Sequence, residues 1–392
     1  MPRVRVAWIT APNTSINDPI ANGLGASEEF VVGMFLPEEA RTQPLDTRNY
    51  TPVYFHMHDW TRPVLGPLLL LNTLQGFSNH DLSGTGIISY RGLSKGLTAF
   101  KPDIVLVNGE YNPYVFQVAS WCRRANIPYI IQTETQRIES RYKRALFSLL
   151  WQTSLHRVFS RSAGVWAWSG SSAQFYRSRL KFTPITVIPP GIDTNLFHPS
   201  TTLQRTKRQM TLFLVVARLV PFKNISTAID ACALLPRHAW RLTIVGDGPL
   251  RSALTEYVKQ LGLAEQITFV KRVPRLQLPK LYARSHALIL PSYNEAIGVV
   301  VPEAMACGTP AVVSDTTGAQ TYLQNRKTGY VFPTADSQAL ARILKLFIDN
   351  NHLQMRVRAS TTIKKSYSLE VTVRRIRLLL TTVHTRHVRL FK

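Results

Sequence analysis

Cysteine is scarce in this sequence. The 392 residues include only Cys122, Cys232 and Cys307, which lie far apart and share no CxxC spacing. Disulfide frameworks and zinc sites need cysteines in pairs or clusters at short, regular spacing. The pattern therefore argues against both, and it predicts three small buried side chains in a protein of a reducing compartment.

Long hydrophobic runs are missing as well. The longest apolar cluster, VLGPLLLL at Val64–Leu71, contains a proline, whereas a membrane-spanning helix needs about 20 consecutive apolar residues. The first residues, MPRVRVAWITAP, interleave charged and apolar side chains, which indicates a first strand rather than a signal peptide. With 45% hydrophobic residues, the composition predicts a soluble globular protein.

Negative charge is the third scarcity. The sequence has 23 Asp and Glu against 47 Lys and Arg, which gives a formal net charge of +24. Such an excess favours an anionic neighbour: nucleic acid, an acidic membrane surface or an anionic substrate. No recognised nucleic-acid-binding motif is present and basic charge alone is non-specific, so nucleic acid is the least favoured of the three.

The length and the strand pattern predict two domains. From about residue 101, short β-rich runs alternate with helical stretches, and the runs are continuously apolar, as in parallel sheets covered by helices on both faces. The runs are DIVLVN, IPYIIQ, GVWAWS, ITVIPP, TLFLVVA, RLTIVG, ITFV, ALILPS, PAVVS and GYVF. A stretch rich in Pro and Gly at Pro189–Ser200, PPGIDTNLFHPS, is interpreted as the linker between the domains.

The predicted fold class is therefore α/β, with two doubly wound parallel-sheet domains. We place the first domain at residues 1–190 and the second at 191–365, followed by a basic C-terminal helix at 366–392. The segment 11–100 is too irregular for its strands to be predicted.

Polar residues follow several predicted strands of the second half, where ligands of an open parallel sheet bind. Arg218 and Lys223 come after TLFLVVA. Two cations at this place can clamp a diphosphate, and solvated surface charges are the alternative. Gly246 and Gly248 follow RLTIVG and permit a tight turn with close backbone approach to a ligand.

Two glutamates, Glu295 and Glu303, bracket an apolar run in the stretch NEAIGVVVPEAMACG. A buried carboxylate is costly without a partner, and one interpretation is that Glu303 favours the start of a helix through the helix dipole. Gly298 precedes that helix, so free backbone N–H groups would face a phosphate. The other interpretation is that the two carboxylates accept hydrogen bonds from sugar hydroxyls while the cations bind a diphosphate. That combination fits a nucleotide sugar.

Between Ser162 and Asn350 the sequence resembles the large family of retaining GT-B glycosyltransferases marked by two glutamates with seven residues between them. The resemblance rests on the order and spacing of VIPPGIDTNLFHP, ARLVPFK, IVGDGPLR, LPSYNEAIGVVVPEAMACGTPAVVS and TGYVF. It implies two Rossmann-like domains that face each other across a cleft, the first binding the acceptor and the second the nucleotide sugar. It also implies a C-terminal helix that crosses back to the first domain, and transfer with retention by front-face attack within a short-lived ion pair.

The same resemblance implies roles for single residues. Arg218 and Lys223 would bind the donor diphosphate. Glu303 would hydrogen-bond the ribose hydroxyls, and Glu295 would hold hydroxyls of the transferred sugar. The donor would be a UDP- or GDP-hexose or a related nucleotide sugar.

Further implications concern the phosphate and metals. Gly298 and the amide of Val299 would lie near the phosphate. No DxD motif occurs in the sequence, which agrees with the metal-independent chemistry of this fold, so neither a metal nor a cofactor beyond the donor is expected. His56 and His58 in FHMHDW have no further ligands at suitable spacing and are predicted to be ordinary packed or surface residues.

The sequence departs from the family at several places. KRV, ending at Val273, occupies a turn beside the nucleobase where the family often has glycine, and Tyr322 stands where a glutamate is common. Glu134 in QTETQ occupies the place of a catalytic histidine; an acid–base or sugar-positioning role and a helix-capping role are both open. Gly25 in GLGASEE resembles part of the N-terminal loop that reaches the donor.

Two basic stretches are interleaved with large apolar residues. They lie at Arg137–Arg161 and at Val373–Lys392, the latter reading VRRIRLLLTTVHTRHVRLFK. This composition is typical of helices at a membrane surface, and an amphipathic helix packed on the core with a basic edge is the alternative. Together with the net charge, the stretches favour an anionic membrane surface, where each Lys or Arg adds roughly 1 kcal/mol of attraction.

The sequence is accordingly interpreted as a hexosyltransferase. We expect it to act on a lipid-linked or membrane-surface glycan acceptor, in glycolipid or cell-envelope polysaccharide synthesis, from the cytoplasmic side of the cell membrane. The same chemistry on a soluble saccharide or small molecule is the alternative, and a nucleic-acid-directed protein is less favoured.

Overall fold

The computed structural model of the chain describes residues 3–10, 16–42, 45–59, 88–109, 112–135, 147–199 and 210–391. The chain divides into two compact units. The first unit comprises Met1–Ile188 together with Thr372–Lys392, and the second comprises Pro189–Val371. The apolar cluster Val64–Leu71 and the basic residues Arg137, Arg141, Lys143 and Arg144 lie outside the described residues.

The first unit is built on a parallel sheet with the strand order β3-β2-β1-β6-β7-β8-β9. Its strands are β1 (Val4–Ile9), β2 (Phe30–Pro37), β3 (Thr51–Phe55), β6 (Ile104–Asn108), β7 (Tyr129–Thr133), β8 (Gly164–Ala167) and β9 (Ile185–Val187). β4 (Met57–Asp59) and β5 (Ile88–Tyr90) form a separate antiparallel pair. The predicted parallel sheet is confirmed, and β2 and β3 are strands that the sequence pattern did not predict.

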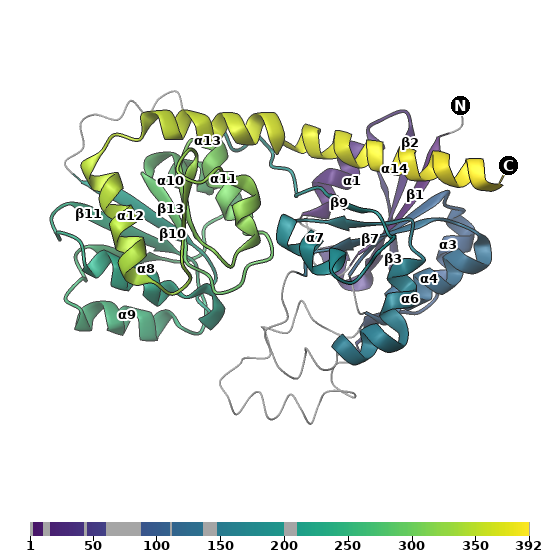
Figure 1. The fold of residues 1–392 in the computed structure, drawn as a ribbon, viewed down its shortest axis with the longest axis horizontal. Helices are drawn as coiled ribbons and strands as arrows, with labels where there is room; N and C mark the ends of the chain where they lie inside the picture. Colours follow the sequence, from purple (N-terminus) through teal and green to yellow (C-terminus); the bar gives the residue numbers. More distant parts are fainter. Residues whose placement is uncertain are drawn as a thin grey trace. The chain divides into compact units, whose positions relative to one another are not determined.

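The helices of the first unit lie on both faces of this sheet (Figure 1). They are η1 (Glu38–Thr42), α1 (Asn17–Gly25), α3 (Leu93–Phe100), α4 (Pro113–Ala125), η3 (Trp151–Leu155), which runs into α6 (His156–Ser160), and α7 (Gly170–Arg177). The long helix α14 (Leu369–Phe391) packs its buried Val373, Ile376 and Leu380 on the unit from Thr372 onward. Its Arg377 donates a hydrogen bond from Nη2 to Glu29 Oε1 over 2.5 Å.

The second unit has a six-stranded parallel sheet with the order β12-β11-β10-β13-β14-β15. Its strands are β10 (Thr211–Val216), β11 (Trp240–Val245), β12 (Ile267–Val270), β13 (Ala287–Leu290), β14 (Ala311–Ser314) and β15 (Gly329–Phe332). Each coincides with an apolar run that the sequence predicted as a strand. The order reverses between β10 and β13, which makes this the point where an open sheet leaves room for a ligand.

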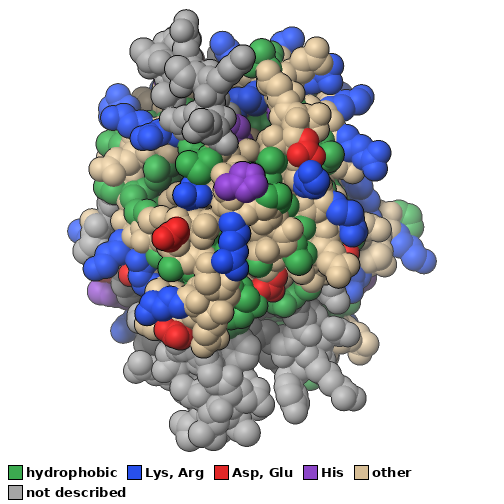
Figure 2. Space-filling view, turned by 90° about the vertical axis from the view of Figure 1, so that its left-hand side faces the viewer, with side chains coloured by type: hydrophobic (Ala, Val, Ile, Leu, Met, Phe, Trp, Pro, Cys, Tyr) green, Lys and Arg blue, Asp and Glu red, His purple; other side chains and the backbone are tan. Residues whose placement is uncertain are grey.

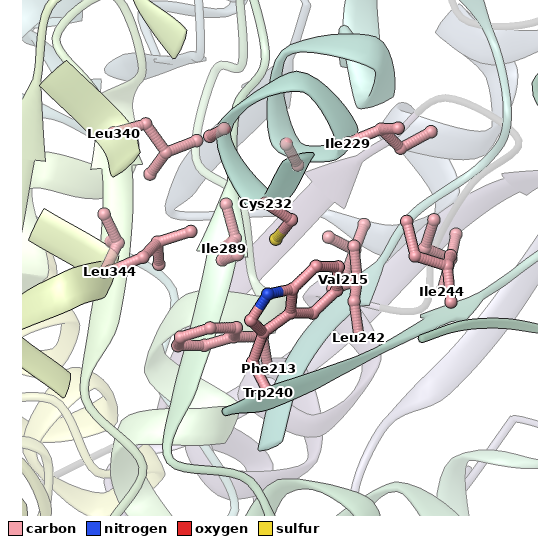
Figure 3. Packing of buried hydrophobic residues seen from close by; sticks show 14 of the residues in the cluster. Phe213, Val215, Ile229, Cys232, Trp240, Leu242, Ile244, Ile289, Leu340 and Leu344 are labelled. Carbon is pink, nitrogen blue, oxygen red and sulfur yellow. The ribbon is translucent and has the colours of Figure 1, made fainter. Parts of the chain in front are cut away.

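Helices cover both faces of the second sheet as well. They are α8 (Ile225–Ala233), α9 (Arg251–Gln260), α10 (Leu278–Arg284), α11 (Val300–Ala306), α12 (Ser337–Asp349) and α13 (Leu353–Ser366), with short turns η4 (Pro221–Lys223), η5 (Arg275–Gln277) and η6 (Gly318–Tyr322). Trp240, Phe213 and Cys232 meet beneath Leu340 and Leu344 of α12 in one buried cluster (Figure 3). Burial of these apolar side chains is the main force that holds the helices on the sheet.

Two expectations from composition can be compared with the fold. Cys122, Cys232 and Cys307 are free and buried, as predicted. Within the described part of the chain, no helix has the length and apolar character needed to cross a membrane.

The stretch interpreted as a linker is in fact a packed part of the second unit. Ile192 and Phe197 are buried, and Ile192 pairs with Ser368 across a parallel bridge. The Pro and Gly residues signalled irregular backbone correctly. They carried no information about the apolar side chains between them, which the second unit buries.

Candidate functional site

The loops that follow β10 and β13 meet where the second sheet reverses its strand order. Lys223 ends η4 after β10, and Glu295 lies in the loop after β13. Lys223 Nζ and a carboxylate oxygen of Glu295 form an ion pair, and the two side chains are 13% and 18% exposed. The structure thus brings together two residues that the sequence placed 72 positions apart, in a setting that water reaches only partly.

Hydrogen bonds between the same two loops hold Lys223 in place. The Tyr293 amide donates to the Phe222 carbonyl over 2.8 Å, and Asn224 Nδ2 donates to the Pro291 carbonyl over 3.2 Å. The Phe222 ring lies next to both predicted cations, since its centroid is 5.2 Å from Lys223 Nζ and 5.8 Å from Arg218 Cζ. Arg218 is exposed, so a positive edge borders this part of the sheet.

Gly246 and Gly248 follow β11 and lie against the loop after β10. Their φ angles are +146° and +155°, and a Cβ atom would lie 1.8 Å from the Ala217 carbonyl oxygen at Gly246 and 2.5 Å from the Leu219 carbonyl oxygen at Gly248. The backbone therefore approaches a neighbour closely here, but that neighbour is another loop of the chain, and approach to a ligand stays a prediction. These glycines let two loops of the site pack together without side chains between them.

Glu303 lies on α11 and is buried, with 6% of its side chain exposed. Its Oε1 accepts hydrogen bonds from Arg275 Nε and Nη2 over 3.3 and 3.2 Å. Its Oε2 accepts one from the Tyr282 hydroxyl over 3.1 Å. Glu303 is the fourth residue of the helix, and no side chain caps the helix start. Among the described residues, the carboxylate is thus held by an arginine and a tyrosine, not by the amides of the first turn.

Arg275 is a site residue that the sequence interpretation missed. It begins η5 after β12, its side chain is half exposed, and its Cζ lies 5.1 Å from the centroid of the Phe197 ring. Val273, the residue predicted beside the nucleobase, is half-buried two positions earlier. A cation in the loop after a strand of this sheet was the available signal, and the abundance of basic residues hid it.

The environment of Glu303 makes stability depend on pH. Burial raises the pKa of this carboxyl above 4.5, and the contacts with Arg275 and Tyr282 oppose the rise. A carboxyl whose pKa is higher in the folded protein loses stability as the pH rises from the unfolded pKa through the folded one. We therefore expect Glu303→Gln, which cannot ionise, to gain Tm relative to the unaltered protein as the pH rises above about 4.5. Thermal unfolding of both proteins below and above that pH checks this, and a Tm difference that stays constant with pH would contradict it.

Gly298 and Val299 connect Glu295 to α11. Gly298 has a φ of +57°, and a Cβ atom there would lie 2.8 Å from Leu290 Cδ2 and 3.2 Å from Glu295 Cγ. The carbonyl of Glu295 accepts a hydrogen bond from the Gly318 amide over 2.7 Å. The glycine thus allows the loop to turn tightly onto β13 and bring Glu295 beside the start of α11.

Other predicted residues lie elsewhere. Glu134 is exposed directly after β7 of the first unit, at the carboxyl edge of that sheet. Gly25 ends helix α1, where a Cβ atom would lie 1.6 Å from the Asn49 carbonyl oxygen. The expectation that Gly25 belongs to a loop is wrong: its small size serves helix packing, at the edge of the sheet where β1 and β2 begin. Tyr322 is buried and donates to the Pro190 carbonyl over 3.1 Å.

Metal ligands are not clustered in the part of the chain that the structure describes. No group of three or more His, Cys, Asp or Glu residues there could hold a metal ion. His56 is exposed, and the side chain of His58 lies outside the described residues.

Two families cover most of the sequence. Residues 49–196 match the family described as Glycosyltransferase Family 4, and residues 204–366 match the one described as Glycosyl transferases group 1. A D-inositol 3-phosphate glycosyltransferase of Acidothermus cellulolyticus is 32% identical over 182 residues, which are 41% of this chain and 40% of that protein. A GDP-mannose-dependent alpha-(1-6)-phosphatidylinositol monomannoside mannosyltransferase of Mycolicibacterium smegmatis is 31% identical over 168 residues, 39% of this chain and 44% of that one. The matches thus span less than half the length of these curated relatives.

Solved structures share the fold over nearly the whole chain. Sucrose-phosphate synthase from Thermosynechococcus elongatus superposes with a TM-score of 0.75 at 18% identity, covering 98% of this chain and 100% of that one. HepE of Anabaena, in complex with UDP and glucose, superposes with a TM-score of 0.70 at 19% identity, covering 97% and 100%. At such low identity the likeness concerns the fold, which is the predicted one.

Proposed function

The chain belongs to the retaining GT-B glycosyltransferases of group 1 and family 4, and on that premise we propose that it transfers a sugar from a nucleotide-diphosphate sugar to an acceptor hydroxyl. The observation that carries the proposal is the Lys223–Glu295 ion pair at the reversal of strand order in the second sheet. A cation and a carboxylate held side by side there offer one partner for a phosphate and one for a sugar hydroxyl.

The donor would occupy the carboxyl edge of the second sheet. In the proposed arrangement Lys223 and Arg218 bind the diphosphate, and Glu295 binds hydroxyls of the sugar. The amides of Gly298 and Val299, before the first turn of α11, lack a helical acceptor and can donate to a phosphate oxygen. Gly246 and Gly248 let the facing loop lie close to the loop after β10, because a Cβ atom at either position would collide with it.

The nucleoside would lie beside Glu303. Ribose hydroxyls donate to this carboxylate in place of the Tyr282 hydroxyl or of Arg275, whose half-exposed guanidinium can turn toward a phosphate or the base. Val273 would border the base. Glu303 is costly to bury as an anion, and a requirement to bind hydroxyls explains why the site keeps it.

The chemistry would rest mainly on stabilisation of the leaving group. The bond between the sugar C1 and the diphosphate oxygen breaks, the acceptor oxygen bonds to C1 on the same face, and the acceptor proton passes to the departing diphosphate. Lys223 and Arg218 would stabilise the charge that grows on that diphosphate, an effect worth several kcal/mol in a site shielded from water. Glu134, at the carboxyl edge of the first sheet, would position the acceptor or the sugar.

When the donor binds, Lys223 and Glu295 would each exchange the other for a new partner on the donor. Lys223 pairs with Glu295 in the structure, so these two charges balance each other. A diphosphate takes over the lysine, and the sugar hydroxyls then satisfy the glutamate. The exchange couples the two halves of the donor, because neither charge is released without a replacement.

The acceptor is proposed to be lipid-linked or at an anionic membrane surface, on its cytoplasmic side. The net charge of +24 supports this, and so does the name of the Mycolicibacterium relative, which specifies a phosphatidylinositol monomannoside. A soluble saccharide or small-molecule acceptor would use the same donor site. Loss of binding to anionic vesicles would favour that second possibility.

A panel of UDP-, GDP- and ADP-sugars tests the proposed function. We expect one nucleotide class to raise the Tm by several degrees and its sugar to be transferred or slowly hydrolysed. Turnover should persist in EDTA, because protein cations are proposed to take the place of a divalent ion. The measurements are thermal shift and product release with and without EDTA. No response to any donor would refute the proposal, and full loss in EDTA with recovery on adding manganese would refute its metal-independent form.

A further inference from the structure

Basic side chains are spread over the surface of this protein, with fewer acidic ones between them, as one face shows in Figure 2. One group differs because it surrounds a cavity. The cavity has a volume of about 840 Å³ and lies in the first unit among α4, the helical segment Trp151–Ser160 and α14. Pro128, Ala163 and Pro184 line it just before β7, β8 and β9 begin. It therefore opens at the amino edge of the first sheet, opposite the edge that carries Glu134.

Four arginines line this cavity: Arg123 of α4, Arg157 of α6, Arg161 just after it, and Arg386 of α14. All four side chains are exposed. No Asp or Glu is among the residues that line the cavity, and over the described ranges no carboxylate pairs with any of the four. Four like charges around one cavity repel each other, so an anion bound there would lower their energy.

The partial negative charges at the C-terminal ends of nearby helices are too small to balance the four arginines. α4 and α6 both end at the cavity, where Asn126 and Arg161 are their C-terminal caps. Each helix end carries roughly half a negative charge, or about one charge for the two together. Four guanidinium groups exceed this by about three positive charges. The excess must be met by solvent or by a ligand.

The apolar side chains around the cavity limit the kind of anion. Phe116, Ile127 and Val158 line it beside the arginines. Leu390, which lines the cavity, is 72% exposed. Phe182 is not a lining residue, but it lies two residues before the lining residue Pro184 and is 96% exposed. An almost fully exposed phenylalanine, two residues along the chain from the wall of a basic cavity, is unfavourable in water but favourable in the interfacial layer of a membrane.

We propose that this cavity binds the phosphate headgroup of an acidic phospholipid, with Phe182 and Leu390 entering the acyl boundary. The site deepens the proposed association with an anionic membrane and does not depend on the donor site. It also brings described residues of both basic stretches of the sequence to one place, since Arg157 and Arg161 come from the first and Arg386 from the second. β7 has five residues, so the carboxyl edge of the sheet would stand roughly 16 Å further from the lipid than the cavity does. An acceptor must then extend from the membrane by about that distance.

The direct test is binding of the full chain to vesicles of phosphatidylcholine with and without phosphatidylglycerol. The variant is Arg157→Gln/Arg161→Gln/Arg386→Gln. The matched control is Arg284→Gln/Arg342→Gln/Arg358→Gln, which removes the same charge from exposed positions of the second unit. We expect the cavity variant to bind acidic vesicles about a hundredfold more weakly and the control to change less than about fivefold. Equal losses in the two variants, or no binding of the unaltered protein to acidic vesicles, would overturn the proposal.

Two further arms separate a lipid from a soluble phosphate. Phe182→Ser/Leu390→Ser keeps every charge, and we expect it to weaken vesicle binding at high salt, where charge attraction is screened. Glycerol 1-phosphate should compete only weakly, because it lacks the apolar part. Full competition by it at millimolar concentration, with no effect of the serine variant, would mean a soluble phosphate site and would refute the lipid.

The thermal shift by nucleotide sugars should be the same in all these variants. A failure of the donor panel with vesicle binding retained would then reject the transferase function alone. A failure of vesicle binding with the donor shift retained would reject this site alone.

Discussion

We expect Lys223→Ala to lower kcat for sugar transfer by about two to three orders of magnitude, the range seen when a preorganised group that stabilises transition-state charge is removed. The ammonium group is proposed to face the diphosphate as its charge grows, so its loss should reduce kcat more than it raises KM. Lys259→Ala is the matched control, because this lysine is 62% exposed on α9 and forms its ion pair with the exposed Glu256. Near-normal turnover of purified Lys223→Ala would reject the assignment of the donor site.

Removal of Lys223 also leaves Glu295 mostly buried without its cation, so instability could imitate a catalytic defect. An unpaired charge in a poorly solvated place is destabilising, whereas loss of both partners is much better tolerated. The double variant Lys223→Ala/Glu295→Gln should therefore recover most of the Tm that the single variant loses. Its turnover should stay low. Recovery of turnover together with Tm would show that the lysine acts on stability alone.

The second large effect is expected from Glu303→Ala, which should weaken binding of the nucleoside diphosphate about ten- to a hundredfold. This is the range for a lost hydrogen bond to a charged group. The proposed partners of Glu303 are the ribose hydroxyls, so the test compares nucleotides with and without those hydroxyls. Calorimetry with UDP or GDP, whichever the donor panel selects, is compared with its 2′,3′-dideoxy form. The unaltered protein should prefer the ribose form, and Glu303→Ala should lose that preference.

Arg275→Ala shows whether Arg275 acts by positioning Glu303 or by binding the nucleotide directly. If Arg275 only holds Glu303 in place, its loss should weaken the ribose form and leave the dideoxy form unchanged, so the ribose preference should be reduced. If Arg275 binds phosphate or base directly, the preference should be unchanged while overall affinity falls. A ribose preference that survives in Glu303→Ala would contradict the role of the carboxylate.

Much of the second unit could be predicted because its signals are local. Runs such as TLFLVVA are apolar at every position, which suits a strand buried on both faces, and each such run became a strand. Glu295, Glu303, Arg218 and Lys223 were found because they follow strand ends, and parallel strands bring their carboxyl ends to one edge. The family resemblance added the roles, which the structure leaves as proposals.

The errors have local causes as well. The glycine-rich GLGASEE was interpreted by its resemblance to the N-terminal loop of the family, yet Gly25 ends α1 and packs closely on Asn49. The supposed linker is packed because Ile192 and Phe197 lie among its Pro and Gly residues. In both places the Gly and Pro content indicated which backbone conformations were accessible. Burial of the neighbouring side chains determined which one the chain adopts.

Residue order and hydrophobic pattern were thus enough for the α/β class, the strands from residue 101 onward, and the candidate ligands at their ends. They could not reveal that Arg275 holds Glu303, that Lys223 pairs with Glu295, or that arginines from α4, α6 and α14 surround one cavity. Strand patterns arise from neighbours along the chain, whose spacing can be read directly. Ion pairs and charged cavities arise between residues tens to hundreds of positions apart, and only the packing of helices on the sheets brings those charges within each other's reach.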